Sequence, residues 1–366
     1  MSVRIDEIEA TTDEVVVRLL ALRRRVYADD DHYCPPFAGT LRSSLCQPVY
    51  APGQRIFVAR RPGEDVACAV VRQPPELSLH GEPVATIGNF EALDDAEATA
   101  ELLSHAAQWA IDQGAQRVVG PMNGDTWHSY RWNLGPRDEA PFLMEPYNPP
   151  YYPTLWEAAG FEVLQTYHSR RIDDVEGAAR HHRPRWAGAR SLGYRIEPMS
   201  EVSFEEALDR VYDMVCVIFA DGFLYTPLRR SGFKKLYDGA EAILDGELSF
   251  FLVDRHGNDA GFAFVFPDYA RAVRAMQGRQ NLWAKVKFLA RRERHRANVK
   301  TFGVMPEHRG QGLAAAMAHK YFDAIATSGF EEANICLIQD DNVGSIKMDG
   351  ERGRVFRRYA LYQWSQ

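Results

Sequence analysis

The sequence predicts an α/β (α+β) fold made of two similar domains, each a mixed, mostly antiparallel sheet flanked by helices. β-rich runs and amphipathic helices appear twice, in nearly the same order. The length of 366 residues, with 46% hydrophobic and 25% charged residues, suits about two globular domains. A polar stretch rich in arginine and histidine separates the two series. We expect an N-terminal domain at 1–175, a linker at 176–193 and a C-terminal domain at 194–366.

The first half is expected to begin with a strand and a helix and to continue through a hairpin. Its strands are predicted at 3–8, 55–60, 67–71, 84–90, 117–120 and 163–172, from runs of β-branched and aromatic residues. Its helices are predicted at 14–27, 97–113 and 153–159, and Gly114 is a natural stop for the second.

The second half repeats this order. Strands are predicted at 194–199, 248–253, 260–266, 299–304, 333–338 and 358–362, and helices at 204–220 and 313–326. The second helix carries Leu313, Met317, Tyr321 and Ile325 at four-residue spacing, which places them on one apolar face.

Composition narrows the function. A net charge of −7 gives no overall bias toward nucleic acid, so we expect no nucleic-acid partner. Five cysteines without a C-x-x-C pair argue against a disulfide framework or a metal site. No apolar run reaches the length of a transmembrane segment, and the N-terminus is too charged for a signal peptide. We expect a cytoplasmic protein.

The most informative segment joins the strand at 299–304 to the helix at 313–326. Gly310 and Gly312 allow the backbone to approach an anion closely, and the first amides of the helix point at it. We interpret this turn as a phosphate cradle. A dinucleotide site also matches formally, with Glu331 and Glu332 as ribose ligands. However, the first glycine lies too far from the strand, and too little chain follows for a doubly wound sheet.

Arg309-x-x-Gly312-x-Ala314 instead resembles the signature of the GNAT superfamily of acyl-CoA-dependent N-acyltransferases. The resemblance implies acetyl-CoA or another acyl-CoA as cofactor. By analogy, its pyrophosphate would lie on the amides of Arg309, Gly310, Gln311, Gly312, Leu313 and Ala314. Asn342 looks like the asparagine that contacts the cofactor after the fifth strand. The amide near Val304, on the fourth strand, would polarise the thioester carbonyl.

The catalytic acid does not follow from the resemblance. Many members carry a tyrosine seven residues after that asparagine, whereas this sequence has Asp349 there. Tyr359 is an alternative acid, and a thiol is already a competent leaving group without one. Glu307, Asp349 or a chain of waters could serve as general base.

The first half lacks the cradle, because Asp94 and Asp95 occupy the equivalent turn and two carboxylates would repel a pyrophosphate. It carries two polar, aromatic loops at 120–133 and 145–153 instead. These resemble a group of bacterial tandem-GNAT proteins of uncertain substrate. We expect the loops either to bind the acceptor, a small-molecule or peptide amine, or to form a rigid satellite core. The candidate acceptor-binding residues are Asn123, Asp125, Tyr130, Asn148 and Tyr152.

Residues 271–300 form a basic, amphipathic insertion with ten Lys or Arg residues and one acid. It could clamp the CoA 3′-phosphate, dock an acidic acyl-carrier protein, rest on an anionic membrane or simply be a solvated surface. The sequence thus predicts an acyl-CoA-dependent N-acyltransferase. A Fem-type aminoacyl transferase and a non-catalytic acyl-CoA-binding protein are the alternatives.

Overall fold

The computed structural model describes residues 2–9, 11–46, 53–242, 244–342 and 352–365. The strands are β1 (Arg4–Ile8), β2 (Gln54–Arg61), β3 (Glu64–Arg72), β4 (Ser78–Leu79), β5 (Glu82–Ala92), β6 (Arg117–Gly120), β7 (Trp132–Gly135), β8 (Phe161–Ile172), β9 (Arg195–Pro198), β10 (Phe250–Val253), β11 (Asp259–Pro267), β12 (Arg296–Val304), β13 (Glu332–Gln339) and β14 (Arg354–Trp364).

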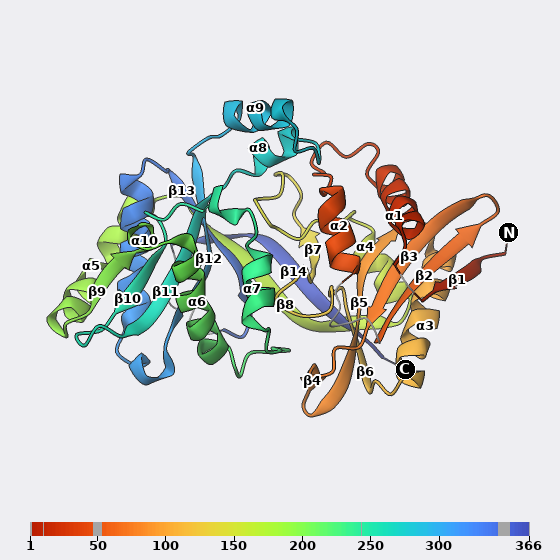
Figure 1. Ribbon diagram of the computed structural model, residues 1–366, viewed down its shortest axis with the longest axis horizontal. Helices are drawn as coiled ribbons and strands as arrows, with labels where there is room; N and C mark the ends of the chain where they lie inside the picture. Colours follow the sequence, from red (N-terminus) through yellow and green to blue (C-terminus); the bar gives the residue numbers. More distant parts are fainter. Residues whose placement is uncertain (1, 10, 47–52, 243, 343–351, 366) are drawn as a thin grey trace.

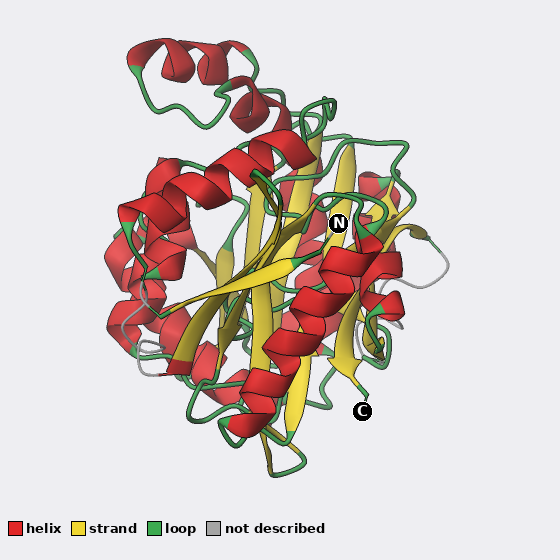
Figure 2. Cartoon of the chain, turned by 90° about the vertical axis from the view of Figure 1, so that its right-hand side faces the viewer, coloured by secondary structure: helices red, strands yellow, loops and turns green. Residues whose placement is uncertain are grey.

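The helices are α1 (Asp13–Val26), α2 (Ala38–Leu45), α3 (Ala96–Asp112), α4 (Tyr152–Ala158), α5 (Val175–Ser191), α6 (Phe204–Ile218), α7 (Arg230–Leu236), α8 (Ala270–Ala275), α9 (Leu282–Ala290) and α10 (Leu313–Thr327). Helices cover both faces of a central sheet, with α5, α6 and α10 at one end of the molecule and α1, α2 and α3 at the other (Figures 1 and 2). The predicted α/β architecture is confirmed.

One continuous sheet of 14 strands runs through both halves. Its main path has the order β1-β2-β3-β5-β6-β14-β8-β13-β12-β11-β10-β9, while β4 pairs with β5 and β7 pairs with β14 beside it. Its parallel pairs are β5 with β6 and β12 with β13, and the other described pairs are antiparallel. The sheet is therefore mixed and mostly antiparallel, as the sequence predicts.

The two halves exchange their last strands. β14 lies between β6 and β8, so the C-terminal strand extends the N-terminal half of the sheet, while β8 pairs with β13. In Figure 1, β14 accordingly runs toward the end of the molecule that holds the N-terminus. The segment at 358–362 was expected to close its own half. The alternation of its residues predicts a strand but carries no information about which neighbour it pairs with.

The segment 176–193, expected to be a linker, is largely helix α5. Asp174 accepts a hydrogen bond from the Gly177 amide at its start, which is a side-chain N-cap. Ala178, Ala179 and Ala189 are buried against the apolar face of α10, in the same core as Met317. Small side chains let the two helices pack closely. The sequence did not predict this helix, because its alanines alternate with arginines and histidines that are typical of a polar linker. The domain limits themselves stay a prediction.

If α5 is part of the core, Ala178→Asp should lower the free energy of unfolding by about 3 kcal/mol or more, because it buries an unpaired carboxylate. Ala187→Asp is the matched control, since Ala187 is an exposed residue of the same helix. Urea unfolding of the two variants measures the difference. Equal, small losses would show that α5 is only loosely attached.

Candidate functional site

Helix α10 begins without a side-chain cap. Its N-cap residue is Gly312 in the left-handed conformation, with φ of 74°, and Gly310 is also left-handed at 81°. Among the described residues, none of the amides from Gly310 to Ala315 donates a hydrogen bond. A side chain on Gly310 or Gly312 would meet nothing within 4 Å. The turn is therefore an open row of unpaired amides at the positive end of a helix dipole, which is an anion-binding arrangement.

The other long helices differ in this respect. Side-chain caps are supplied by Thr12 to α1, by Asp95 to α3, by Ser203 to α6 and by Asn281 to α9. α3 is the counterpart of α10 in the first half, and there Asp95 caps the amide of Ala98 while it pairs with Arg61. Its hydrogen bond to Arg61 lowers the pKa of Asp95, so the carboxylate is ionised at neutral pH. In the first half the Asp95 carboxylate thus occupies the start of α3, whereas the equivalent position at the start of α10 has no side-chain cap.

Side chains around the cradle hold it in place. The Arg309 guanidinium donates to the carbonyls of Val304, at 3.3 Å, and Ile218, at 3.0 Å, and so joins the ends of β12 and α6. The Tyr194 hydroxyl lies 2.9 Å from His308 Nδ1 and donates to Gln311 Oε1 at 3.1 Å. The side chain of Arg309 therefore fixes the turn against β12 and α6. It could favour a bound anion through its charge and by holding the turn in position.

Strands β12 and β13 separate beside the cradle. Their last parallel pair is Val299 with Ile335. Immediately beyond it, β12 carries the extra residue Lys300 in its pairing with β11. β13 likewise carries an extra residue against β8, where Leu337 has φ of 59°. Bulges bend a strand and increase its twist, so two bulges at one level force the strands apart.

The opening leaves backbone amides of β12 exposed along one edge. The Met305 amide donates to the Ala260 carbonyl, on the β11 side. Because antiparallel strands direct successive amides to alternate sides, the N–H groups of Phe302 and Val304 point toward the opening. The sequence-predicted role of the Val304 amide therefore has a suitable geometry.

The first half closes the same opening with its own chain. β5 and β6 part after Thr86 and Val119. The Met122 amide then donates to the Ile87 carbonyl, and the Asn123 side-chain oxygen accepts from the Asn89 amide at 2.6 Å. Asn123, expected to contact the acceptor, instead occupies the edge of β5. A donor molecule has no room at that edge.

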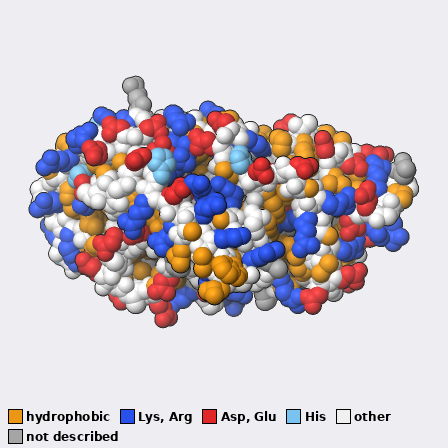
Figure 3. All heavy atoms as spheres, turned by 90° about the horizontal axis from the view of Figure 1, so that it is seen from above, with side chains coloured by type: hydrophobic (Ala, Val, Ile, Leu, Met, Phe, Trp, Pro, Cys, Tyr) orange, Lys and Arg blue, Asp and Glu red, His pale blue; other side chains and the backbone are white. Residues whose placement is uncertain are grey.

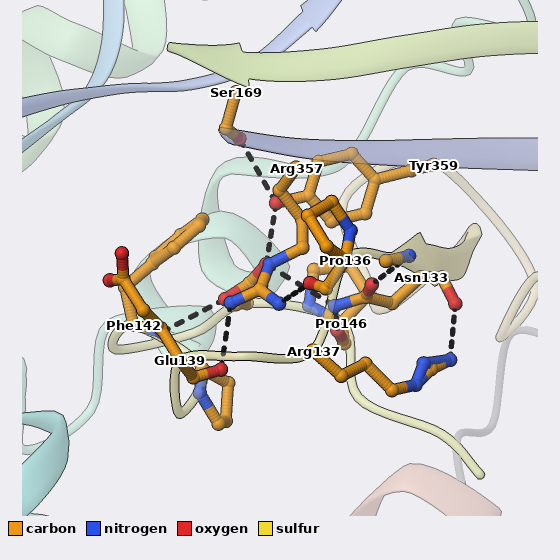
Figure 4. A network of polar contacts seen from close by, with 12 residues as sticks. Asn133, Pro136, Arg137, Glu139, Phe142, Pro146, Ser169, Arg357 and Tyr359 are labelled. Carbon is orange, nitrogen blue, oxygen red and sulfur yellow. Dashed lines mark hydrogen bonds and ion pairs between the residues drawn. The ribbon is translucent and has the colours of Figure 1, made fainter. Parts of the chain in front are cut away.

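A buried polar network lies behind the β13 bulge (Figure 4). The Leu337 amide donates to Ser169 Oγ, which lies 3.0 Å from the Tyr359 hydroxyl, and Tyr359 donates to Glu145 at 2.6 Å. Arg357 pairs with Glu145 at 3.0 Å. Burial raises the pKa of Tyr359 well above its usual value, so its hydroxyl stays protonated. The described partners of the Tyr359 hydroxyl are Ser169 and Glu145.

The remaining candidates on the second half are at the surface or undescribed. Glu307 is exposed in the short 3₁₀ turn Pro306–His308, next to the cradle. Asn342 is exposed in the turn that follows β13, and its amide donates to the Gln339 carbonyl. Asp349 lies outside the described residues. The roles of Glu307 and Asn342 stay predictions.

For two of the acceptor-binding candidates the structure corrects the expectation. Tyr152 is fully buried, and its hydroxyl accepts from the Ala92 amide and donates to Glu91. Asn148 is also buried, and its side-chain oxygen accepts from the Asn133 amide at 2.7 Å. Both side chains are fixed inside the protein and hold the loop at 145–153 in place. Polarity in a turn-rich segment does not reveal whether its groups face solvent or satisfy buried backbone.

Asp125 likewise organises its own loop, since it accepts from the amides of Trp127 and His128. Tyr130 differs because it is half-buried, with the Arg131 guanidinium 3.8 Å from its ring centroid and 4.0 Å from that of Tyr167. This cation–π stack stands where the two halves meet.

Trp127 carries the loop across to the second half. Its ring nitrogen donates to the Thr226 carbonyl at 2.9 Å, and its ring packs against Tyr225 and Phe233. The turn after α6 and the loop at 120–133 therefore form one wall. Trp127 was not predicted as a functional residue, although an exposed-looking tryptophan between polar residues is a signal of an interface.

Lys300 is the functional candidate that sequence reasoning missed. It is the extra residue of the β12 bulge, at the level where β12 and β13 part. Burial lowers the pKa of its ammonium to about 8, and the nearby charge of Arg131 acts in the same direction. Cys336 and Glu145 act in the opposite direction. A lysine in a basic run of sequence gives no sign of this placement.

Comparison with known proteins agrees with this geometry. Residues 210–350 match the model of the acetyltransferase (GNAT) family. A tandem GNAT protein from the clavulanic acid biosynthesis pathway, solved without AcCoA, has a TM-score of 0.55 at 14% identity and aligns over 99% of this chain and 98% of its own. Residues 210–350 therefore match a GNAT-family domain, and the whole chain has the fold of a tandem GNAT protein.

A GCN5-related N-acetyltransferase from Sphaerobacter thermophilus is also similar to this chain, with a TM-score of 0.50, 13% identity and coverage of 98% and 95% of the two chains. Eis1 from Mycobacterium abscessus has a TM-score of 0.50 and 10% identity over 99% and 73%. No curated protein sequence matches. At these identities the likeness concerns the fold.

The lowered pKa of Lys300 makes a prediction about stability. The desolvation cost is fully present below pH 8 and disappears as the pH approaches the unfolded-state pKa, near 10.4. Lys300→Met should therefore raise the free energy of unfolding by about 2 kcal/mol at pH 7 and have little effect at pH 10. Urea unfolding at both pH values measures this, with the exposed Lys285→Met as control. A gain that does not change with pH would show that the ammonium is well solvated.

Proposed function

We propose that this protein is a tandem GNAT enzyme, an acyl-CoA-dependent N-acyltransferase with one donor site, in its second half. The observation that carries the proposal is the uncapped start of α10, whose amides from Gly310 to Ala315 have no partner among the described residues and lie beside the opening of β12 and β13. Acetyl-CoA is the first donor to test, and longer acyl-CoAs are the next.

The residues present fit such a donor. The amides from Gly310 to Ala314 would hold the pyrophosphate, because Gly310 and Gly312 leave the approach open. The Arg309 amide, expected to join them, instead donates to the Pro306 carbonyl at 3.1 Å. The edge amides of β12 up to Val304 would pair with the pantetheine arm, and Asn342 lies at the end of β13 as a further contact. An acyl-CoA bound there would supply an activated thioester to an attacking amine.

The chain itself would position and stabilise the reacting groups. The amides of Phe302 and Val304 point into the opening, where a developing oxyanion needs donors fixed in advance. Tyr359 is held protonated and contacts Ser169, so to protonate the leaving thiolate it would have to act through Ser169 and an intervening group. Glu307 and Asp349 remain candidates for the base. Lys300, with its lowered pKa, joins them.

The acceptor amine would enter from the junction of the halves. Tyr130 and Arg131 come from the first half, and the turn at Thr226 comes from the second. An aromatic and cationic wall of this kind suits an acceptor that carries a carboxylate or another anionic group beside its amine. We include a cytoplasmic location in the proposal, since the five cysteines are all free thiols.

The donor site is tested by calorimetry with CoA. The wild-type protein should bind one CoA per chain, and Gly312→Asp should abolish binding because it adds a charge and a side chain against the pyrophosphate. Gly329→Asp is the control, because Gly329 lies at the other end of the same helix. Its φ of 80° is close to the 74° of Gly312, and a side chain at either position would meet nothing within 4 Å. Retained binding in Gly312→Asp would overturn the assignment of the cradle.

The reaction is tested by mass spectrometry of the protein with acetyl-CoA and a pool of amines. Acylated product should form, and it should be missing with Gly312→Asp. Stoichiometric CoA binding without any product would indicate a non-catalytic acyl-CoA-binding protein. Product formed only from aminoacyl-tRNA would indicate a Fem-type ligase.

Once an acceptor is known, two loop variants should behave in opposite ways. Tyr130→Phe should lower kcat/KM for the acceptor while CoA affinity and Tm stay nearly unchanged, because it keeps the half-buried ring and removes only a hydroxyl whose described partner is the neighbouring Arg131. Asn148→Ala should instead cost about 2 kcal/mol of stability, because it leaves the buried Asn133 amide without its acceptor. A Tyr130→Phe variant that melts early would make this loop scaffolding.

A further inference from the structure

Helix α9 turns its apolar side away from the protein. Leu282 and Trp283 are each 75% exposed, Leu289 is 62% exposed and Val286 is 46% exposed. Residues 282, 286 and 289 follow helical spacing, so they form one face with Trp283 beside them. The opposite face attaches the helix through buried Ala284 and through Phe288, whose ring lies 5.9 Å from that of Tyr269. A surface helix normally has the reverse arrangement.

Basic side chains surround this apolar face. Lys285, Lys287 and Arg291 are exposed and make no ion pair among the described residues. Residues 271–300 contain ten Lys or Arg and one acid, whereas the whole chain carries a net charge of −7. The positive charge is therefore local to this arm, which consists of α8, α9 and the chain that joins them to β11 and β12.

The arm is the most prominent projection of the molecule. It stands above the sheet, away from the other helices, in Figures 1 and 2. Figure 3 shows the molecule from that side, with a group of hydrophobic side chains bordered by Lys and Arg. An apolar face on a convex projection offers no groove in which a ligand could be enclosed.

The position of the arm rules out a role at the cradle. The arm joins β12 at Arg296, whereas the cradle follows the other end of this strand, after Val304. A strand of this length spans roughly 25 Å, at about 3.3 Å per residue. A basic side chain of the arm therefore lies too far away to clamp the 3′-phosphate of a donor on α10.

We propose that α9 docks this protein on an anionic lipid bilayer, with Leu282, Trp283, Val286 and Leu289 in the headgroup region and the basic side chains against lipid phosphates. A fluid bilayer can receive a convex apolar face, whereas a folded partner needs a matching groove. Tryptophan prefers the membrane interface, and lysine and arginine add electrostatic attraction to anionic lipid. No helix in the described part of the chain is long and apolar enough to cross the bilayer, so the attachment is peripheral.

Docking in this way would also orient the site. The arm and the cradle lie at opposite ends of β12, so the cradle would face away from the bilayer. A water-soluble donor could then reach α10 while the protein stays attached.

The test is flotation of the full-length protein with vesicles of phosphatidylcholine alone and with 30% phosphatidylglycerol. We expect binding to the anionic vesicles only, weakened by raising the salt concentration. Trp283→Ser should reduce the bound fraction roughly ten-fold, and Lys285→Glu with Lys287→Glu should do the same. Leu192→Ser is the matched control, because Leu192 is 54% exposed at the end of α5, far from the arm.

The proposal is overturned if anionic vesicles do not bind the protein, or if Trp283→Ser binds them as well as the wild type. A dimer that depends on Trp283, seen by sedimentation without vesicles, would assign the face to a second copy. Binding of an acidic acyl-carrier protein through the arm, with no vesicle binding, would assign it to that partner. None of these measurements requires donor or acceptor, so they are independent of the proposed activity.

Discussion

The pairing of β14 with β8 is the constraint on which the rest of the structure depends. These two strands form the centre of the sheet. β14 comes from the second half of the sequence but pairs with β6 of the first half, and β8 comes from the first half but pairs with β13 of the second. The core of the first half therefore includes Ala360 and Tyr362 from the end of the chain. The core of the second half includes Ile172. Neither half can complete its sheet alone, so the junction between them is held by backbone hydrogen bonds as well as by side chains.

This junction gives the two halves different tasks. The two halves of the sheet part at equivalent places, after Thr86 in one half and after Val299 in the other. In the first half the chain itself fills the gap through Met122 and Asn123. In the second half, bulges at Lys300 and Leu337 keep the gap open next to an uncapped helix. The first half of the sheet is thus closed by its own chain, whereas the second half has both an opening between strands and an uncapped helix beside it.

The scaffold extends behind the open site as a buried polar network. Glu145 and Arg357 form an ion pair that is almost completely buried. Tyr359 donates to the same oxygen, Oε1, that Arg357 contacts, and the Phe142 amide donates to Oε2. Such a pair contributes little net stability, because desolvation offsets most of the attraction. Its effect is to fix the loop at 136–146 against β14, and it thereby ties the first half to the back of the opening.

The sequence by itself determined the local features. Hydrophobic periodicity placed most strands and helices. Gly310 and Gly312 marked the turn before α10, because left-handed backbone depends mainly on the residue itself and its neighbours. Tertiary structure alone decided which strand pairs with which, since the alternation of residues along β14 or β8 does not specify a neighbouring strand. It also decided which polar residues are exposed: Asn148 and Tyr152 became core, Lys300 came to the opening, and the apolar face of α9 stayed outside. Strand pairing and burial depend on contacts between residues far apart in the chain, and the local pattern of a single sequence does not determine those contacts.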